Sequence, residues 1–126
     1  MFRVSCGFQC DRPYLRLGPE VETHLYRITQ EAVNNAITHG RGRRIEISLS
    51  FRKRGGILSI RDDGVGISKK SLEGKSIGMH SMDYRSRLIG GSLQVQRLAR
   101  CGTAVTCEFR LPPDLPKERR HARKKN

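Results

Sequence analysis

Apolar residues recur along residues 20–39 at the spacing of one face of a helix. Val21, Leu25, Ile28, Ala32 and Ala36 follow one another at intervals of four, three, four and four residues, so they form a single stripe. A stripe of this kind predicts a long amphipathic helix whose apolar face packs against the rest of the protein.

The remaining pattern predicts strands on both sides of this helix. Apolar and polar residues alternate over residues 44–51, which indicates a strand with one wet face. Further strands are expected over residues 2–10, 57–61, 92–98 and 103–111, with a turn at Gly55 and Gly56. A second helix is expected over residues 78–89, and a short helical piece near residues 68–72. This order predicts an α+β fold, a two-layer sandwich with helices on one face of a mixed, mostly antiparallel sheet.

Two polar side chains disturb the apolar stripe of the long helix. On a wheel of about 100° per residue, Asn35 falls within the stripe and Glu31 lies at its edge. A buried amide must find hydrogen-bond partners or it destabilises the fold. Asn35 is therefore either a core residue bonded to backbone groups or a binding residue for a ligand or a metal ion.

A second polar segment follows the strand expected at residues 57–61. Asp62 stands at its end, where a carboxylate can accept a hydrogen bond from an amine. Gly64 and Gly66 allow a tight turn and a close approach of the backbone to a ligand. Aspartate-glycine turns are also common in ordinary loops, so this segment alone does not distinguish a binding loop from a plain turn.

Two later segments complete the pattern. Residues 78–91 read as a short helix that packs through Met79 and Met82 and is stopped by a glycine pair. Gly102 and Thr103 lie between two strand patterns, where they could form a simple hairpin turn.

In this order and at these separations, the four segments resemble the ATP-binding catalytic domain of sensor histidine kinases. That domain lies within the wider group of gyrase, Hsp90, histidine kinase and MutL. Residues 25–36, LYRITQEAVNNA, resemble the nitrate-sensor and degradation-regulator subgroup, as do Gly78 and Met79 followed by Met82 and Arg85. The resemblance covers residues 2–112. It implies the Bergerat fold, with ATP and Mg²⁺ held between the helix layer and a lid at residues 67–78.

The resemblance implies catalytic roles along the first helix. Asn35 matches the asparagine that holds the magnesium ion bridging the ATP phosphates. Glu31 matches the acidic residue that orients or deprotonates the attacking group, and His39 matches a position near the phosphates. The spacing of four residues places all three along one side of the helix.

The same resemblance implies the contacts with the nucleotide. The matching positions are Asp62, Gly64, Gly66, Ile67, Gly78, Met79 and Thr103. Asp62 matches the aspartate that reads the exocyclic amine of adenine, and Thr103 matches a hydroxyl on the adenine side. The glycines let the chain run under the nucleotide and close the lid.

The sequence departs from the family at two places within the motifs. Thr38 stands where a lysine is usual, and residues 76–79 read SIGM where the lid usually reads Gly-x-Gly-Leu. Both changes alter contacts expected near the phosphates, but neither touches Asn35 or Asp62.

A larger departure concerns the phosphoacceptor. No helical dimerisation domain precedes the motifs, and none of the four histidines stands in a phosphoacceptor context; His24 is expected on a helix surface. The expected partners are therefore a phosphoacceptor histidine on a separate dimerisation domain and a LuxR-type response regulator. Homodimers or membrane attachment would arise only through that missing part. The alternatives are a free-standing ATP-binding regulator, such as an anti-sigma-type serine kinase or a pseudokinase, and a nucleic-acid-binding protein.

Length and charge fit one domain with a basic tail. The chain has 126 residues and a net charge of +13. Residues 114–126 contain six basic and two acidic side chains of this total. We expect residues 1–113 to form the domain and the tail to be disordered and solubilising, since it lacks the aromatic residues that stack on nucleic acid. A nucleic-acid partner is therefore not favoured.

The chain shows no apolar run that could span a bilayer and no signal peptide, so a cytoplasmic location is expected. The four cysteines, Cys6, Cys10, Cys101 and Cys107, have no Cys-x-x-Cys spacing. They are expected to be reduced, with a zinc site joining the two pairs as a minor alternative.

Overall fold

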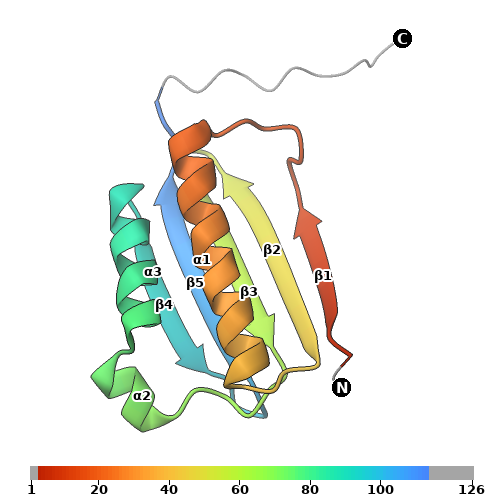
Figure 1. Cartoon of the computed structure of the whole chain (residues 1–126). Helices are drawn as coiled ribbons and strands as arrows, with labels where there is room; N and C mark the ends of the chain where they lie inside the picture. Colours follow the sequence, from red (N-terminus) through yellow and green to blue (C-terminus); the bar gives the residue numbers. More distant parts are fainter. Residues whose placement is uncertain (1–2, 114–126) are drawn as a thin grey trace.

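Helices cover one face of a five-stranded sheet in the computed structural model, which describes residues 3–113 (Figure 1). The elements, in chain order, are β1 (Ser5–Cys10), α1 (Pro19–Thr38), β2 (Arg44–Arg52), β3 (Gly55–Asp62), α2 (Lys69–Gly74), α3 (Ile77–Leu88), β4 (Ser92–Arg97) and β5 (Thr103–Arg110). The strand order is β1-β2-β3-β5-β4. Only β1 and β2 pair in parallel, so the expected mixed, mostly antiparallel sheet is confirmed.

The long helix α1 begins and ends at residues suited to those positions. Pro19 occupies the start of the helix, where its missing N–H is not needed, and it follows Gly18 at a φ of 95°. At the other end, the backbone N–H groups of His39 and Gly40 both donate to the carbonyl of Asn35. This end of α1 places Asn35 and His39 near the end of β3, in one cavity with Asp62.

The predicted stripe of α1 is its buried face. Leu25, Ile28, Ala32 and Ala36 are buried, and Val21 is half-buried. The largest fully buried side chains of the described residues come from both layers and are Ile28, Ile45, Ile60, Met82, Cys107 and Ser86. The core therefore lies between the helices and the sheet.

The turn between β2 and β3 was predicted at the wrong place. Lys53 and Arg54 form the turn, whereas Gly55 and Gly56 belong to β3. Gly56 pairs with Phe109 of β5, and a Cβ added at Gly56 would lie 2.3 Å from an atom of that aromatic ring. The glycine therefore makes room for a ring inside the sheet and does not form the turn.

The other predicted bounds agree within two residues, except that β1 begins at Ser5 and not at residue 2. The tail at 114–126 lies outside the described residues, so the predicted domain boundary and the predicted disorder remain predictions. No helix within residues 3–113 is both long enough and apolar enough to cross a membrane.

Candidate functional site

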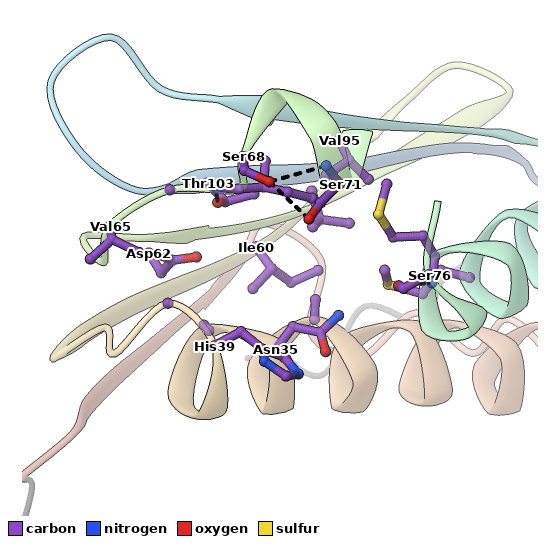
Figure 2. A pocket seen from close by; sticks show the side chains of 18 residues that line it. Asn35, His39, Ile60, Asp62, Val65, Ser68, Ser71, Ser76, Val95 and Thr103 are labelled. Carbon is purple, nitrogen blue, oxygen red and sulfur yellow. Dashed lines mark hydrogen bonds between the residues drawn. The ribbon is translucent and has the colours of Figure 1, made fainter. Parts of the chain in front are cut away.

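A cavity of about 430 Å³ opens between α1, the ends of β3 and β5, and residues 65–76. Its lining residues are Ala32, Asn35, Ala36, His39, Gly40, Ile60, Asp62, Val65, Gly66, Ile67, Ser68, Ser71, Ser76, Met79, Met82, Val95, Thr103 and Val105. The predicted site residues among them are Asn35, His39, Asp62, Gly66, Ile67, Met79 and Thr103. Figure 2 shows Asn35 on α1 and His39 at the carboxyl end of that helix, across the cavity from Asp62 and Thr103.

Asn35 has the surroundings of a binding residue. Its side chain is half-buried and lines the cavity. Among residues 3–113, no group forms a hydrogen bond with its carboxamide, although its backbone carbonyl accepts two. The interpretation of Asn35 as a core amide bonded to backbone therefore finds no support, and an oxygen ligand remains available at the cavity wall.

Glu31 lies one turn earlier on α1 and does not line the cavity. Its carboxylate lies instead against Gly78, in the first turn of α3. A Cβ added at Gly78 would come within 2.5 Å of Glu31 Oε2. Gly78 does not line the cavity either. Its missing side chain lets the amino-terminal end of α3, where an anion is favoured, approach the Glu31 carboxylate.

Asp62 ends β3 with its carboxylate at the cavity. Its Oδ1 accepts the backbone N–H of Gly64 at 2.8 Å, and no donor within residues 3–113 reaches its Oδ2. Gly64 itself does not line the cavity. A Cβ there would lie 2.2 Å from the carbonyl oxygen of Gly40, so glycine is required where this loop crosses the end of α1. The crossing is closed by a hydrogen bond from the Val65 N–H to the Gly40 carbonyl at 2.8 Å.

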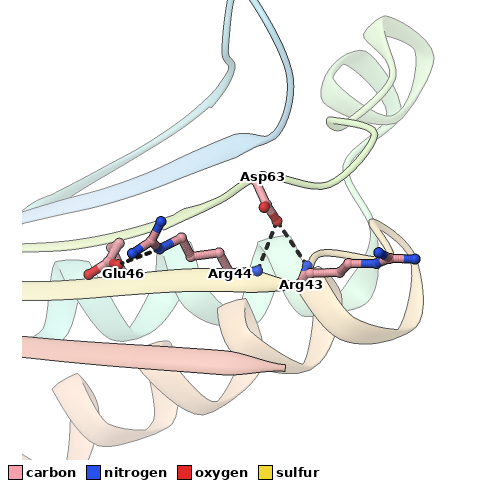
Figure 3. A network of polar contacts seen from close by, with 4 residues as sticks. All are labelled: Arg43, Arg44, Glu46 and Asp63. Carbon is pink, nitrogen blue, oxygen red and sulfur yellow. Dashed lines mark hydrogen bonds and ion pairs between the residues drawn. The ribbon is translucent and has the colours of Figure 1, made fainter. Parts of the chain in front are cut away.

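The neighbouring aspartate has a different, structural task. Asp63 Oδ1 accepts the backbone N–H groups of Arg43 and Arg44 at 2.8 and 2.9 Å, and Arg44 also forms an ion pair with Glu46 (Figure 3). These two hydrogen bonds hold the pKa of the Asp63 carboxyl below its ordinary value. Asp63 thereby fastens the start of β2 to the end of β3, next to the loop that carries His39 and Gly40.

Three serines of the lid segment line the cavity and were not predicted. Ser68 caps α2 by accepting the N–H of Ser71 at 3.0 Å, and the two hydroxyls are 2.9 Å apart. Ser76 caps α3 by accepting the N–H of Met79 at 3.2 Å. A serine before each helical piece was the available signal, because serine is a favoured helix N-cap. The lid lysines at positions 69, 70 and 75 are exposed and do not line the cavity.

His24 was predicted on a helix surface, which is wrong. The side chain is half-buried, and its Nδ1 lies 3.1 Å from Nη1 of Arg85 on α3. Because a guanidinium only donates, Nδ1 accepts this hydrogen bond. His24 therefore joins α1 to α3 and does not take part in the cavity.

The residues fit a magnesium nucleotide better than a zinc ion. No group of three or more His, Cys, Asp or Glu residues in the described part of the chain could hold a metal, and the four cysteines are free. Magnesium takes most of its oxygen ligands from phosphates and water, so the carboxamide oxygen of Asn35 would suffice. The unpartnered Asp62 Oδ2 would accept an amine at the other side of the same cavity.

Residues 20–114 match the family described as histidine kinase-, DNA gyrase B-, and HSP90-like ATPases. The chain belongs to this family. The family prediction made from the sequence is therefore confirmed: this is an ATPase domain of the histidine kinase type, and ATP is the nucleotide that this membership supports.

Two curated relatives and one solved structure illustrate the similarity. The chain is 32% identical over 108 residues to the signal transduction histidine-protein kinase/phosphatase DegS of Bacillus subtilis, covering 82% of this chain and 28% of that protein. It is 32% identical over 94 residues to the oxygen sensor histidine kinase NreB of Staphylococcus carnosus, covering 74% and 27%. The chain thus spans about a quarter of the length of these relatives.

The structural match shows the fold. The histidine kinase domain of the blue-light activated histidine kinase from Erythrobacter litoralis EL346 superposes with a TM-score of 0.74 at 20% identity. The match covers 86% of this chain and 52% of that one. The predicted α+β sandwich is therefore confirmed as the fold of histidine kinase ATP-binding domains.

Proposed function

We propose that this chain binds Mg-ATP in the cavity and donates the γ-phosphate to a histidine on a helical dimerisation domain outside residues 1–126. The observation that carries the proposal is the pair of half-buried polar groups on opposite walls. The Asn35 carboxamide and the Asp62 Oδ2 have no hydrogen-bond partner among the described residues, and both line the same cavity. Half-buried groups of this kind are satisfied at low cost by a ligand.

The two walls take different parts of the nucleotide. Asp62 accepts the exocyclic amine of adenine, and Gly66 and Ile67 form the wall beneath the base. Thr103 Oγ1 accepts the N–H of Ile67 at 2.8 Å, so its own proton is available to the adenine side. Asn35 would hold the magnesium ion, which supplies charge neutralisation at the phosphates when bound.

Glu31 and His39 serve the transfer step. In that step the acceptor imidazole nitrogen bonds to the γ-phosphorus, the bond to ADP breaks, and Glu31 takes the imidazole proton. The Glu31 carboxylate lies outside the cavity, against the amino-terminal end of α3. This position suits contact with a group that arrives from another domain. His39 lines the cavity with Asn35. In the proposed complex it would lie near the phosphates.

The proposed setting is a two-component pathway. The similar proteins are named histidine kinases, which supports a response regulator as the final acceptor. That this regulator is of the LuxR type is proposed from the motif resemblance alone. Dimerisation and any membrane attachment would come from segments outside this chain. We place the domain in the cytoplasm, where ATP and response regulators are found.

Two substitutions test the assignment by calorimetric titration with ATP, with and without Mg²⁺. Asn35→Ala should remove the gain in affinity that Mg²⁺ gives, while ADP without metal still binds. Asp62→Ala should weaken every adenine nucleotide by about tenfold to hundredfold, with or without metal, because a charged hydrogen bond is lost. Asn34→Ala is the matched control, since this neighbour on α1 is exposed and outside the cavity. Wild-type Mg-ATP affinity in Asn35→Ala would reject the magnesium role.

A further inference from the structure

The backbone of Ile67 is held on both sides by side chains from the β4–β5 hairpin. Its N–H donates to Thr103 Oγ1 at 2.8 Å, and its carbonyl accepts a hydrogen bond from Arg97 Nη1 at 3.4 Å. Arg97 ends β4 and Thr103 begins β5, and the two residues are paired in the sheet. The cross-strand pair Arg97 and Thr103 therefore forms hydrogen bonds with both the backbone carbonyl and the backbone N–H of Ile67.

The side chain of Arg97 also packs over Gly66, the residue before Ile67. Gly66 has a φ of 85°, and a Cβ there would lie 3.3 Å from Arg97 Cγ and 3.0 Å from the carbonyl oxygen of Gly102. Gly66 is thus confined between the arginine stem and the turn that joins β4 to β5. A long arginine stem can bury apolar surface in this way while its charged end stays in water.

Gly66 and Ile67, which Arg97 contacts, lie at the start of the lid. Gly66 and Ile67 line the cavity, and Ser68, the next residue, caps α2. Arg97 does not line the cavity, and it forms no ion pair with any acid in residues 3–113. Its contacts with Gly66 and Ile67 are therefore what distinguish it from an ordinary surface arginine.

We propose that Arg97 is a positioning residue which, with Thr103, clamps Gly66 and Ile67 onto the end of the β4–β5 hairpin. The wall beneath the nucleotide then stays fixed, and the lid moves from Ser68 onwards. The effect on nucleotide binding rests on the proposed function, but the clamp itself does not need a nucleotide.

Amide hydrogen exchange of the nucleotide-free protein, followed by NMR, tests the clamp directly. Arg97→Ala should speed exchange of the Ile67 amide about threefold to tenfold, the effect of losing one hydrogen bond and its packing. Arg97→Met, which keeps the stem, should give an intermediate rate. Arg100→Ala is the matched control, because Arg100 is exposed in the same turn. Equal Ile67 exchange in Arg97→Ala and Arg100→Ala would overturn the proposal.

Release of a fluorescent ADP analogue tests the consequence for binding. Arg97→Ala should raise the dissociation rate about threefold to tenfold and leave the dependence on Mg²⁺ unchanged, whereas Arg100→Ala should match wild type. Equal dissociation rates in the two variants would overturn the positioning role. If the wild-type chain bound no nucleotide, the proposed function would fail. The exchange experiment would still show whether Arg97 holds Ile67 in place, because it uses the nucleotide-free protein.

Discussion

Single residues in this domain differ in role according to what surrounds them. Asp62 and Asp63 are neighbours, yet Asp62 presents an unpartnered oxygen to the cavity whereas Asp63 is bonded to two backbone N–H groups. Asp62 is the last residue of β3, whereas Asp63 follows the strand and faces the backbone N–H groups at the start of β2, which explains the difference. Cys107 shows mainly the effect of burial, because it lies in the core with no exposed surface, and the neighbouring Glu108 carboxylate acts on its pKa in the same direction.

The buried thiol predicts a loss of stability in alkali. Burial raises the pKa of Cys107 from 9.0 to about 12. The unfolded chain therefore releases this proton from about pH 9 upwards while the folded chain keeps it, so the free energy of unfolding falls as the pH rises. The slope from this one group approaches 1.4 kcal/mol per pH unit, roughly, between the two pKa values.

Urea unfolding at a series of pH values measures this slope. Cys107→Ala should flatten the alkaline fall, and Cys101→Ala, at an exposed cysteine, should retain it. A fall in Cys107→Ala as steep as in wild type would show that other groups cause it.

At the scale of elements, glycines fix how strands and helices approach one another. Gly56 admits the Phe109 ring, whose partner Phe51 stacks edge-on at a centroid distance of 6.3 Å. Gly78 admits the Glu31 carboxylate, and Gly64 admits the carbonyl of Gly40. Each approach joins two elements that are far apart in the sequence.

Gly56→Ala should destabilise the domain by about 1–3 kcal/mol, because the added methyl group collides with the Phe109 ring inside the sheet. Gly74→Ala is the comparison, since its added Cβ at the end of α2 would meet no atom within 4 Å apart from its chain neighbours and the backbone of its own helix. That variant should be neutral or slightly stabilising. Thermal or urea unfolding measures both changes, and equal stabilities would contradict the packing account.

At the scale of the whole molecule, local patterns were enough for much of the fold. The apolar spacing of α1 predicted its buried face, and the motif order predicted the sheet and its helix layer. The motifs also placed Asn35, Asp62 and Thr103, which the structure brings to one cavity. Membership of the ATPase family confirms the identification.

What the sequence did not predict depends on contacts between distant segments. Gly56 belongs to β3 and not to the turn, and there it pairs with Phe109 of the adjacent strand β5, far later in the sequence. The contact of His24 with Arg85 links two helices that are 61 residues apart in the sequence. The hydrogen bond from Arg97 to the Ile67 carbonyl forms only when the β4–β5 hairpin packs against the start of the lid. No local periodicity reports such pairs, because each residue alone fits an ordinary surface or turn position.

The most direct test of the central claim is a crystal structure of this chain with Mg²⁺ and a non-hydrolysable ATP analogue. We expect the analogue in the cavity between α1 and the lid, its adenine amine hydrogen-bonded to Asp62 and its metal bound by the Asn35 carboxamide oxygen. A nucleotide bound elsewhere, or a cavity filled by lid side chains at saturating analogue, would contradict the account.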